Sequence, residues 1–381
     1  MIPVKTTHLI ILGGSLTALA LIRDGHRLGL TVTVLCAPEQ IACLSRLATQ
    51  ISVDEHDDAA LCAAIAALPE AASSALICDS DHMLRFLRRE RDWLDAHVGR
   101  ILHPGDDTLE ICLDKAACGW WCRAQGIPTP ITYEVDDALT RVSPPPNYPI
   151  LIRPEETRHG SARGLPKAME LHYDDDLEIV LQRFREAGVR PVVNESLLCV
   201  GLRQFSIGVA RRADGETRAV TAEKLRPLPH HCAAGSYVQT VDAPEARDLA
   251  LSAIEALDYI GIAELEILHD PNTGRYHLIE INARPWAQYP IAARAGVDLL
   301  GFLLGLERKP GTTASATWID FGADFHFALS AQGVVRGREI TLFSWLGSVI
   351  HANCHAYWDS RDQKPFWRQT RVLLTRIFKA M

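Results

Sequence analysis

Three carboxylates and one amide are spaced so that they can meet on a single β-hairpin. Two apolar-rich runs, 263–268 and 276–281, flank the sequence HDPNTGR, whose Asp-Pro-Asn-Thr-Gly residues are typical of a turn. Because side chains alternate between the two faces of a strand, each run places two polar side chains on one face. These side chains are Glu264, Glu266, Glu280 and Asn282. Such hard oxygen ligands suit Mg²⁺, which proteins typically hold with one or two carboxylates plus the phosphates of a nucleotide.

The alternative for this hairpin is a solvated polar face, since an exposed glutamate on a strand needs no further explanation. The sequence LIEIN, however, lies in an apolar run that looks buried, and a buried carboxylate requires a partner. LEIL followed by LIEINARPW resembles the metal-binding hairpin of the ATP-grasp superfamily, ligases that use ATP to join a carboxylate to an amine or another nucleophile. The resemblance implies that Glu266, Glu280 and Asn282 bind Mg²⁺ or Mn²⁺. It also implies that Arg284 faces the transferred phosphate, whereas Glu264 matches no ligand position.

The composition describes a globular protein of more than one domain. With 381 residues the chain is long enough for two or three domains, and its hydrophobic fraction of 48% is typical of packed cores. A net charge of −8 argues against a nucleic-acid surface. No run approaches about 18 apolar residues, so we expect no transmembrane segment, and the start MIPVKTTHLIILGG leads directly into a strand and turn, so we expect no signal peptide. Ten cysteines without a regular framework favour free thiols in a reducing cytoplasm over disulfides.

The first hundred residues predict a small parallel α/β sheet. Residues 8–36 are expected to form a strand, a turn at Gly13 and Gly14, a helix and a second strand. Further alternation predicts helices at 58–67 and 81–96 and strands at 74–78 and 100–102. No acidic residue ends the second strand, so a nicotinamide cofactor is not expected. Ligands of open α/β sheets bind at the carboxyl ends of the strands, here near Gly13, Gly14 and Ser15.

A second landmark is the sequence CLDKAACGWWCRAQGIPTP. Asp114 is a good helix N-cap, Gly126 ends the predicted helix and two prolines follow. This segment resembles the DK helix of the ATP-grasp superfamily, which implies that Lys115 reaches ATP phosphate oxygens. The alternative is a solvated lysine in a first helical turn.

A third landmark follows the proline-rich connection at 144–146. The strand YPILIRP resembles one in which ATP-grasp ligases carry a phosphate-binding lysine, and here the corresponding residue is Arg153. Arginine keeps the charge but offers a planar fork, so the geometry of phosphate binding must differ. The loop after it matches the glycine-rich lid of the superfamily, which implies nucleotide contacts from His159, Gly160 and Ser161; an ordinary hairpin loop is the alternative. A helix is expected at 175–187.

Two further segments complete the expected site. PVVNESLL resembles the adenine-binding segment, which implies that Glu195 accepts hydrogen bonds from the nucleotide and that Leu197 lends backbone groups to the adenine. Lys224 and Arg226 stand at alternate positions of a strand and hence on one face. Two cations on one face suit a substrate carboxylate or a transferring phosphoryl group, so we assign catalytic roles to Lys224 and Arg226, and the resemblance implies a catalytic role for Arg284.

The last 75 residues fit the resemblance less well. His351, Cys354 and His355 have spacings that could bind zinc, but a set of four ligands is incomplete. The terminal WRQTRVLLTRIFKAM predicts a basic amphipathic helix, which suits a membrane surface, a partner groove or, as we favour, docking on its own domain.

Together these patterns predict an α/β and α+β protein with a Rossmann-like parallel sheet followed by a two-part ATP-grasp fold. The predicted parts are a Rossmann-like domain at 1–108, a small ATP-grasp subdomain at 109–195, a catalytic subdomain at 196–308 and a helical extension at 309–381. The resemblance implies a cytoplasmic ligase, a candidate homodimer, that uses ATP and Mg²⁺. It would activate a small-molecule carboxylate as an acyl phosphate and join it to an amine, releasing ADP and phosphate.

The resemblance is strongest to the branch of standalone bacterial ligases that includes D-aspartate ligase and many enzymes of natural-product and cell-surface polysaccharide clusters. Two other classes stay open: a degenerate ATP-binding regulatory protein, for which Arg153 is the argument, and a phosphotransferase on the same fold. The identity of the carboxylate and of the amine cannot be read from these residues.

Overall fold

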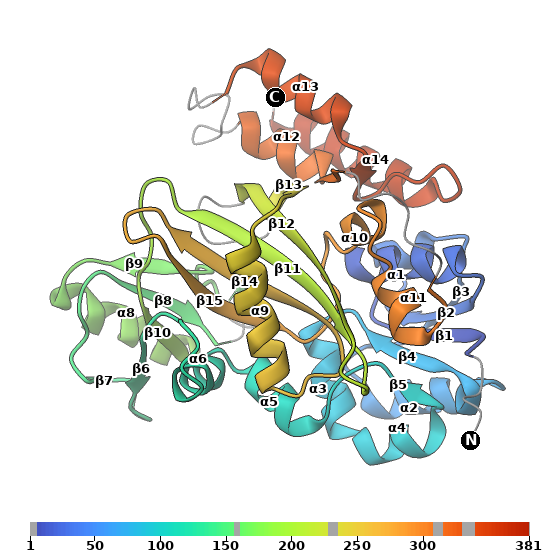
Figure 1. The fold of residues 1–381 in the computed structure, drawn as a ribbon, viewed down its shortest axis with the longest axis horizontal. Coiled ribbons are helices and arrows are strands. Elements are labelled where there is room, and N and C mark those ends of the chain that lie inside the picture. The colour runs from blue at the N-terminus through green and yellow to red at the C-terminus, as the bar shows by residue number, and fades with distance from the viewer. Residues whose placement is uncertain (1–5, 156–160, 228–234, 308–314, 330–339, 381) are drawn as a thin grey trace.

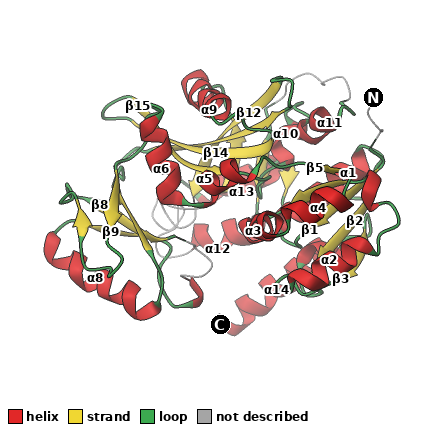
Figure 2. Cartoon of the chain, turned by 90° about the horizontal axis from the view of Figure 1, so that it is seen from below, coloured by secondary structure: helices red, strands yellow, loops and turns green. Residues whose placement is uncertain are grey.

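The computed structural model describes residues 6–155, 161–227, 235–307, 315–329 and 340–380. Within these residues the strands form three sheets, of five, five and seven strands. Figure 1 shows the N-terminal sheet on the right, the second sheet on the left and the largest sheet between them. Seen from below, in Figure 2, the second sheet and its helix α8 (Asp174–Ala187) stand apart from the N-terminal layer. This arrangement matches the predicted fold class.

The N-terminal sheet is parallel throughout and has the order β3-β2-β1-β4-β5. Its strands are β1 (His8–Leu12), β2 (Thr31–Cys36), β3 (Thr49–Ser52), β4 (Ala75–Cys78) and β5 (Arg100–Ile101). Its helical segments are α1 (Leu16–Arg27), η1 (Ile41–Leu44), α2 (Asp58–Ala66), η2 (Ala71–Ser73), α3 (Asp81–Arg89) and α4 (Arg91–His97). The sheet predicted from the sequence is confirmed, although the helix expected at 81–96 is two helices that meet at Glu90.

A pair of helices leads from this sheet to the second one. They are α5 (Asp106–Leu113) and α6 (Lys115–Ala124), and both pack on the strand β15 (Arg275–Asn282). Asp114 caps α6 as predicted, because its carboxylate accepts hydrogen bonds from the backbone N–H groups of Ala116 and Ala117 at 2.8 and 2.9 Å. Lys115 therefore starts the helix and lies at its positive end.

The second sheet is antiparallel and has the order β7-β6-β10-β8-β9. Its strands are β6 (Thr132–Val135), β7 (Val142–Ser143), β8 (Ile150–Pro154), β9 (Met169–Leu171) and β10 (Pro191–Glu195). Helix α8 covers one face, where Leu181 and Phe184 pack with Ile150 and Ile152. Because side chains alternate along a strand, Leu151 and Arg153 lie on the other face of the sheet, where they line a cavity.

The third sheet is the largest and has the order β15-β14-β11-β12-β13-β16-β17. Besides β15 its strands are β11 (Arg203–Arg211), β12 (Thr217–Pro227), β13 (Gly235–Thr240), β14 (Gly261–Asp270), β16 (Thr317–Ile319) and β17 (Cys354–His355). Helix α9 (Pro244–Ala256) covers one face, in front of the sheet in Figure 1, and α11 (Leu299–Leu304) packs on the other, preceded by α10 (Pro290–Arg294). The predicted hairpin forms as β14 and β15.

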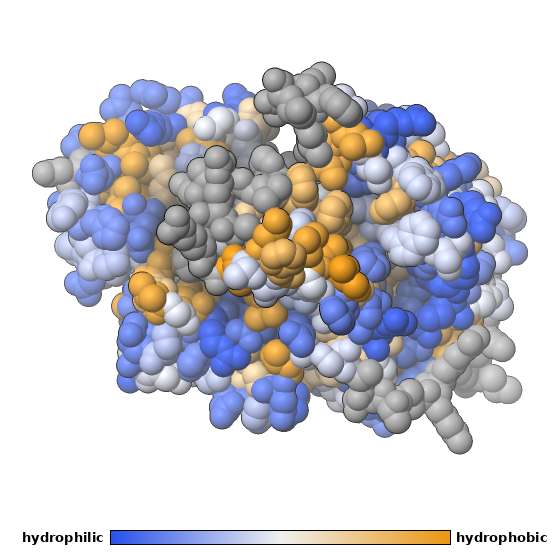
Figure 3. Space-filling view, turned by 90° about the horizontal axis from the view of Figure 1, so that it is seen from above, coloured by the Kyte–Doolittle hydropathy of each residue, from blue (hydrophilic) through white to orange (hydrophobic). Residues whose placement is uncertain are grey.

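The C-terminal extension lies at the top of Figure 1 and consists of α12 (Phe321–Leu329), α13 (Leu342–His351) and α14 (Lys364–Ala380). The predicted terminal helix forms as α14 and packs on α12 and η1. Exposed apolar side chains gather on this extension, including Phe343 and Ile350, and Figure 3 shows an apolar patch on the same side of the molecule.

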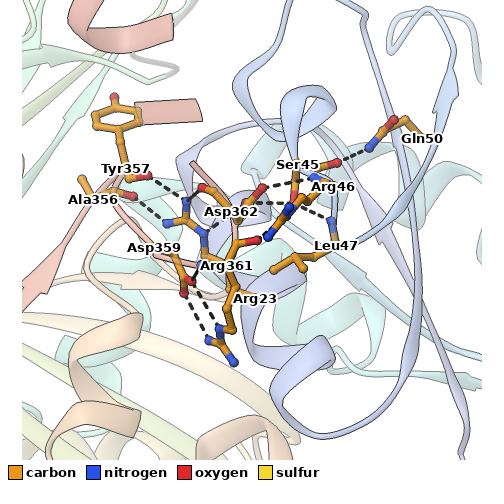
Figure 4. A network of polar contacts seen from close by, with 10 residues as sticks. All are labelled: Arg23, Ser45, Arg46, Leu47, Gln50, Ala356, Tyr357, Asp359, Arg361 and Asp362. Carbon is orange, nitrogen blue, oxygen red and sulfur yellow. Dashed lines mark hydrogen bonds and ion pairs between the residues drawn. The ribbon is translucent and has the colours of Figure 1, made fainter. Parts of the chain in front are cut away.

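A polar network connects the C-terminal extension to α1 and to the segment that follows η1 (Figure 4). The fully buried Asp362 carboxylate accepts hydrogen bonds from Arg23 Nε, Ser45 Oγ and the Arg46 backbone N–H at 3.3, 2.9 and 3.1 Å. Arg23 also donates to the Tyr357 carbonyl at 2.8 Å. Segments more than 300 residues apart in the chain are therefore held together by buried charge-assisted hydrogen bonds.

The expectation of free thiols alone is wrong at one pair of cysteines. Cys36 and Cys43 form a disulfide with their Cα atoms 6.8 Å apart, whereas the other seven cysteines in the described ranges are free. The pair forms because η1 folds back on the carboxyl end of β2, a contact that a spacing of seven residues does not reveal. In the described part of the chain, no helix is both long and apolar enough to cross a membrane.

Candidate active site

A cavity of about 1140 Å³ lies where the three sheets meet. The N-terminal sheet contributes Ser15 and Asp79 from the carboxyl ends of its strands, the edge that the sequence predicted. The second sheet contributes Arg153, and the hairpin of the third sheet contributes Glu266 and Glu280. Residues from opposite ends of the chain therefore line one space.

The hairpin brings together the three predicted metal ligands Glu266, Glu280 and Asn282, which all line the cavity. Glu266 and Glu280 stand directly opposite each other in the register of the two strands. Lys115 Nζ lies 3.5 Å from Glu280 Oε1. Burial would raise the pKa of Glu280, but the Lys115 and Arg153 cations outweigh it and the pKa is lowered. Glu280 is therefore ionised, the state in which a carboxylate binds a metal cation.

Lys224 is buried beside the hairpin and faces the same carboxylates. Its Nζ lies 2.6 Å from Glu266 Oε1 and 3.8 Å from Glu264 Oε1. Burial would lower the pKa of Lys224, but the Glu266 and Glu264 carboxylates outweigh it and the pKa is raised. Lys224 therefore stays charged inside the cavity wall.

Glu264, to which the sequence assigned no role, holds its neighbours in place. Its carboxylate accepts hydrogen bonds from Ser206 Oγ and, at 3.2 Å, from Asn282 Nδ2. Glu264 is only 4% exposed, and this burial raises the pKa of its carboxyl group. It orients both Lys224 and Asn282, a role that depends on the strand register of Glu264 opposite Asn282.

Arg284 connects the hairpin to the N-terminal sheet. Its Nε donates to Asp81 Oδ1 at 2.7 Å, and its Nη2 donates to Asn282 Oδ1 at 3.1 Å. Burial would lower the pKa of Arg284, but the Asp81 carboxylate outweighs it and the pKa is raised. Asp81, in the first turn of α3, was not predicted because its partner lies 203 residues away.

Asp79 lines the cavity on the side of the N-terminal sheet. It is buried, and its carboxylate accepts the backbone N–H of Ser15 at 2.8 Å. Gly13, with φ of +100°, permits this approach, because a Cβ atom there would come within 1.9 Å of Asp79 Oδ1. Glycine at this predicted turn therefore leaves room for the Asp79 carboxylate.

The predicted nucleotide-binding residues that the structure describes also line the cavity. These are Lys115, Arg153, Ser161, Glu195 and Leu197. Lys115 Nζ donates to the Glu155 carbonyl at 3.2 Å, and Glu195 Oε2 accepts from the backbone N–H of Ile131 at 3.2 Å. His159 and Gly160 lie outside the described residues.

Three buried polar atoms of the cavity lining have no hydrogen-bond partner among the described residues. They are Arg153 Nε, Asn194 Oδ1 and Gln204 Oε1. A buried polar group without a partner costs about 1–3 kcal/mol, so such groups are rare in folded proteins. Donors and acceptors of a polar ligand in this cavity would remove that cost.

Arg226 is not brought to the cavity with Lys224. The pairing of β12 with β13 shifts register between the two residues, and Arg226 lies beyond this shift, toward the C-terminal extension. Arg226 instead donates through Nε to Asp324 at 2.7 Å and through Nη1 to Ser348 Oγ at 2.9 Å. It is 5% exposed and stacks on Tyr237, and it fastens the C-terminal extension to the third sheet.

The donor set of the hairpin fits Mg²⁺ or Mn²⁺. Glu266, Glu280 and Asn282 line the cavity, and carboxylate and amide oxygens are hard ligands that suit these ions. Within the described ranges no three His, Cys, Asp or Glu side chains group around a point where a metal ion could sit. The hairpin would therefore supply only part of a coordination shell, as it would when nucleotide phosphates supply the rest.

Comparisons with known proteins address the fold. No family model matches the chain. The carbamoyl phosphate synthase large chain of Thermotoga neapolitana is 29% identical over 174 residues, which are 41% of this chain. That of a Thermoanaerobacter species is 26% identical over 259 residues, or 62% of this chain. The chain spans only 15% and 23% of the lengths of these relatives.

Solved structures resemble most of the chain. The N5-carboxyaminoimidazole ribonucleotide synthetase of Thermotoga maritima has a TM-score of 0.60 and 19% identity, and the match covers 82% of this chain and 80% of that one. An enzyme of the same name in its ADP complex has a TM-score of 0.67 and 14% identity, with 86% of both chains covered. Biotin carboxylase of Campylobacter jejuni has a TM-score of 0.61 and 16% identity, with 82% and 74% covered. At these identities the likeness establishes a shared fold.

Proposed function

We propose that this chain is an ATP-dependent ligase of the ATP-grasp type, which joins a carboxylate to an amine. The observation that carries the proposal is the pairing of Glu266 and Glu280 in one cavity with the cations of Lys115 and Lys224. A site for a nucleoside triphosphate requires carboxylates that bind a divalent metal ion, next to basic side chains that contact the phosphate oxygens. The three unpartnered polar atoms in the lining support a polar ligand of this kind.

We assign the two ends of the cavity from the positions of these groups. Arg153, Ser161, Glu195 and Leu197 would bind the nucleotide, and Lys115 would contact its phosphates. Glu266, Glu280 and Asn282 would hold Mg²⁺, which neutralises charge on the terminal phosphates when bound. The carboxylate substrate would then lie near Ser15, toward the N-terminal sheet, because that part of the cavity is left over.

The reaction needs two displacements. A carboxylate oxygen attacks the γ-phosphorus, the bond between the γ-phosphorus and its bridging oxygen breaks, and ADP leaves. The amine nitrogen then attacks the acyl carbon, phosphate leaves, and the nitrogen loses a proton. Lys224 and Arg284, next to the hairpin carboxylates, would stabilise the charge on the phosphoryl group during transfer. We leave Arg226 out of this proposal because Asp324 and Ser348 hold it elsewhere.

The experiment is a screen of ADP release with pairs of carboxylic acids and amines, followed by mass spectrometry of the products. We expect ADP release that requires a carboxylate, and an amide product that requires both substrates. Nucleotide binding without ADP release under any pair would favour the regulatory alternative. A phosphorylated product that accumulates although the amine is present would favour the phosphotransferase.

A further inference from the structure

One buried imidazole joins the two walls of the cavity through backbone atoms. His103, which follows β5, is 5% exposed. Its Nε2 lies 2.7 Å from the backbone nitrogen of Cys78, and its Nδ1 lies 3.0 Å from the carbonyl oxygen of Ala283. A backbone N–H can only donate and a carbonyl can only accept, so the ring accepts at Nε2 and donates from Nδ1. Burial lowers the pKa of His103 to about 3, so the ring is neutral and this tautomer is fixed.

The two backbone partners of His103 adjoin residues that line the cavity. Cys78 ends β4 and is followed by Asp79, which holds the Ser15 backbone N–H. Ala283 directly follows the hairpin, between Asn282 and Arg284. The ring therefore fixes the distance between the N-terminal wall and the end of the hairpin.

A second connection between the same two walls is the ion pair of Arg284 with Asp81 at 2.7 Å. The arginine side chain has several rotatable bonds, so this ion pair survives small shifts of the backbone. The hydrogen bond from His103 acts on the backbone itself, one residue before Arg284. It therefore fixes the backbone positions from which the Asn282 and Arg284 side chains extend.

We propose that His103 is a positioning residue that holds Asn282 and Arg284 in register with the substrate wall of the N-terminal sheet. This inference rests on the proposed function, in which Asn282 holds the metal and Arg284 faces the phosphoryl group. A misplacement of about 1 Å in an active site can cost about a hundredfold in rate, so a shift of this hairpin end is large enough to matter.

Two substitutions separate positioning from stability. In His103→Asn the side-chain amide reaches the place of Nδ1, keeps the donor to Ala283 and loses the bond to Cys78. In His103→Gln the amide reaches the place of Nε2, keeps the acceptor for Cys78 and loses the bond to Ala283. Each variant loses one buried hydrogen bond, so their losses of stability should be similar.

The expected results differ between the two variants. His103→Gln should lower kcat by about ten- to a hundredfold, while the KM for ATP stays within about threefold, because the phosphoryl end and not the adenine end is displaced. His103→Asn should keep kcat within about threefold. Hydrogen–deuterium exchange of the backbone at 282–286 should rise in His103→Gln and not in His103→Asn.

Equal losses of kcat in the two variants, in proportion to their losses of stability, would overturn the proposal. If the parent enzyme releases no ADP with any substrate pair, the proposed function fails, and the exchange experiment still tests the placement of the hairpin by His103. Should neither variant fold, the imidazole ¹⁵N shifts of the parent protein decide: a proton on Nδ1 between pH 5 and 8 supports the proposal, and a proton on Nε2 contradicts it.

Discussion

Replacing Arg153 with methionine should weaken ATP binding without unfolding the protein. The Arg153 Nε atom is buried in the cavity wall and has no hydrogen-bond partner in the described part of the chain. Methionine keeps much of the apolar stem and removes the cation together with its unpaired donor. A hydrogen bond between a charged group and a ligand contributes about 1.5–3 kcal/mol. Because 1.4 kcal/mol is a factor of ten, the Kd for ATP should rise by about ten- to a hundredfold.

The assay is isothermal titration calorimetry with ATP and Mg²⁺, beside the thermal midpoint of each protein. Arg190→Met is the matched control, since Arg190 flanks β10 in the same sheet and is half-exposed beside the fully exposed Asp137. The control should bind ATP like the parent protein. If Arg153→Met also binds ATP like the parent, Arg153 is structural and the alignment of β8 with the phosphate-binding strand is wrong. Arg153→Lys should keep part of the affinity, because it keeps the charge.

Three further predictions concern the hairpin and the buried ion pairs. Glu280→Gln keeps the side-chain volume and removes the charge, so Mg²⁺-dependent turnover should collapse while the thermal midpoint stays nearly unchanged; normal turnover would contradict the metal assignment. Arg226→Met leaves the buried Asp324 without its cation, which should lower the free energy of unfolding in urea by about 3–5 kcal/mol with little change in ATP affinity. A loss of turnover without a loss of stability would indicate that Arg226 has a catalytic role. Asp362→Asn removes the charge beside Arg23 and should cost about 1.5–3 kcal/mol of unfolding free energy, and an unchanged urea midpoint would refute a stabilising role for this network.

The elements with strong local signals could be predicted from the sequence. The apolar run HLIIL is fully buried in β1, and the Gly13 turn leads into α1 as expected. Asp114 caps α6, and the HDPNTGR turn closes the hairpin of β14 and β15. Each of these features depends on neighbours within a few residues, so a pattern in the chain is enough to reveal it.

Features that depend on register or on distant partners could not be predicted. Strand alternation predicts Lys224 and Arg226 at one site, but Arg226 pairs with Asp324, a partner 98 residues away that no strand pattern reveals. Glu264 gains its role only because it lies opposite Asn282. His103 has no local motif at all, because Cys78 and Ala283 meet it only in the folded chain.

The central claim is that ATP transfers its γ-phosphoryl group to the oxygen of a substrate carboxylate. The most direct measurement uses a carboxylic acid substrate labelled with ¹⁸O in both oxygens, with the amine present, and follows the products by ³¹P nuclear magnetic resonance. We predict ADP together with orthophosphate that carries one ¹⁸O atom, and a hydroxamate when hydroxylamine replaces the amine. Release of AMP and pyrophosphate, or orthophosphate without ¹⁸O, would contradict the acyl phosphate route.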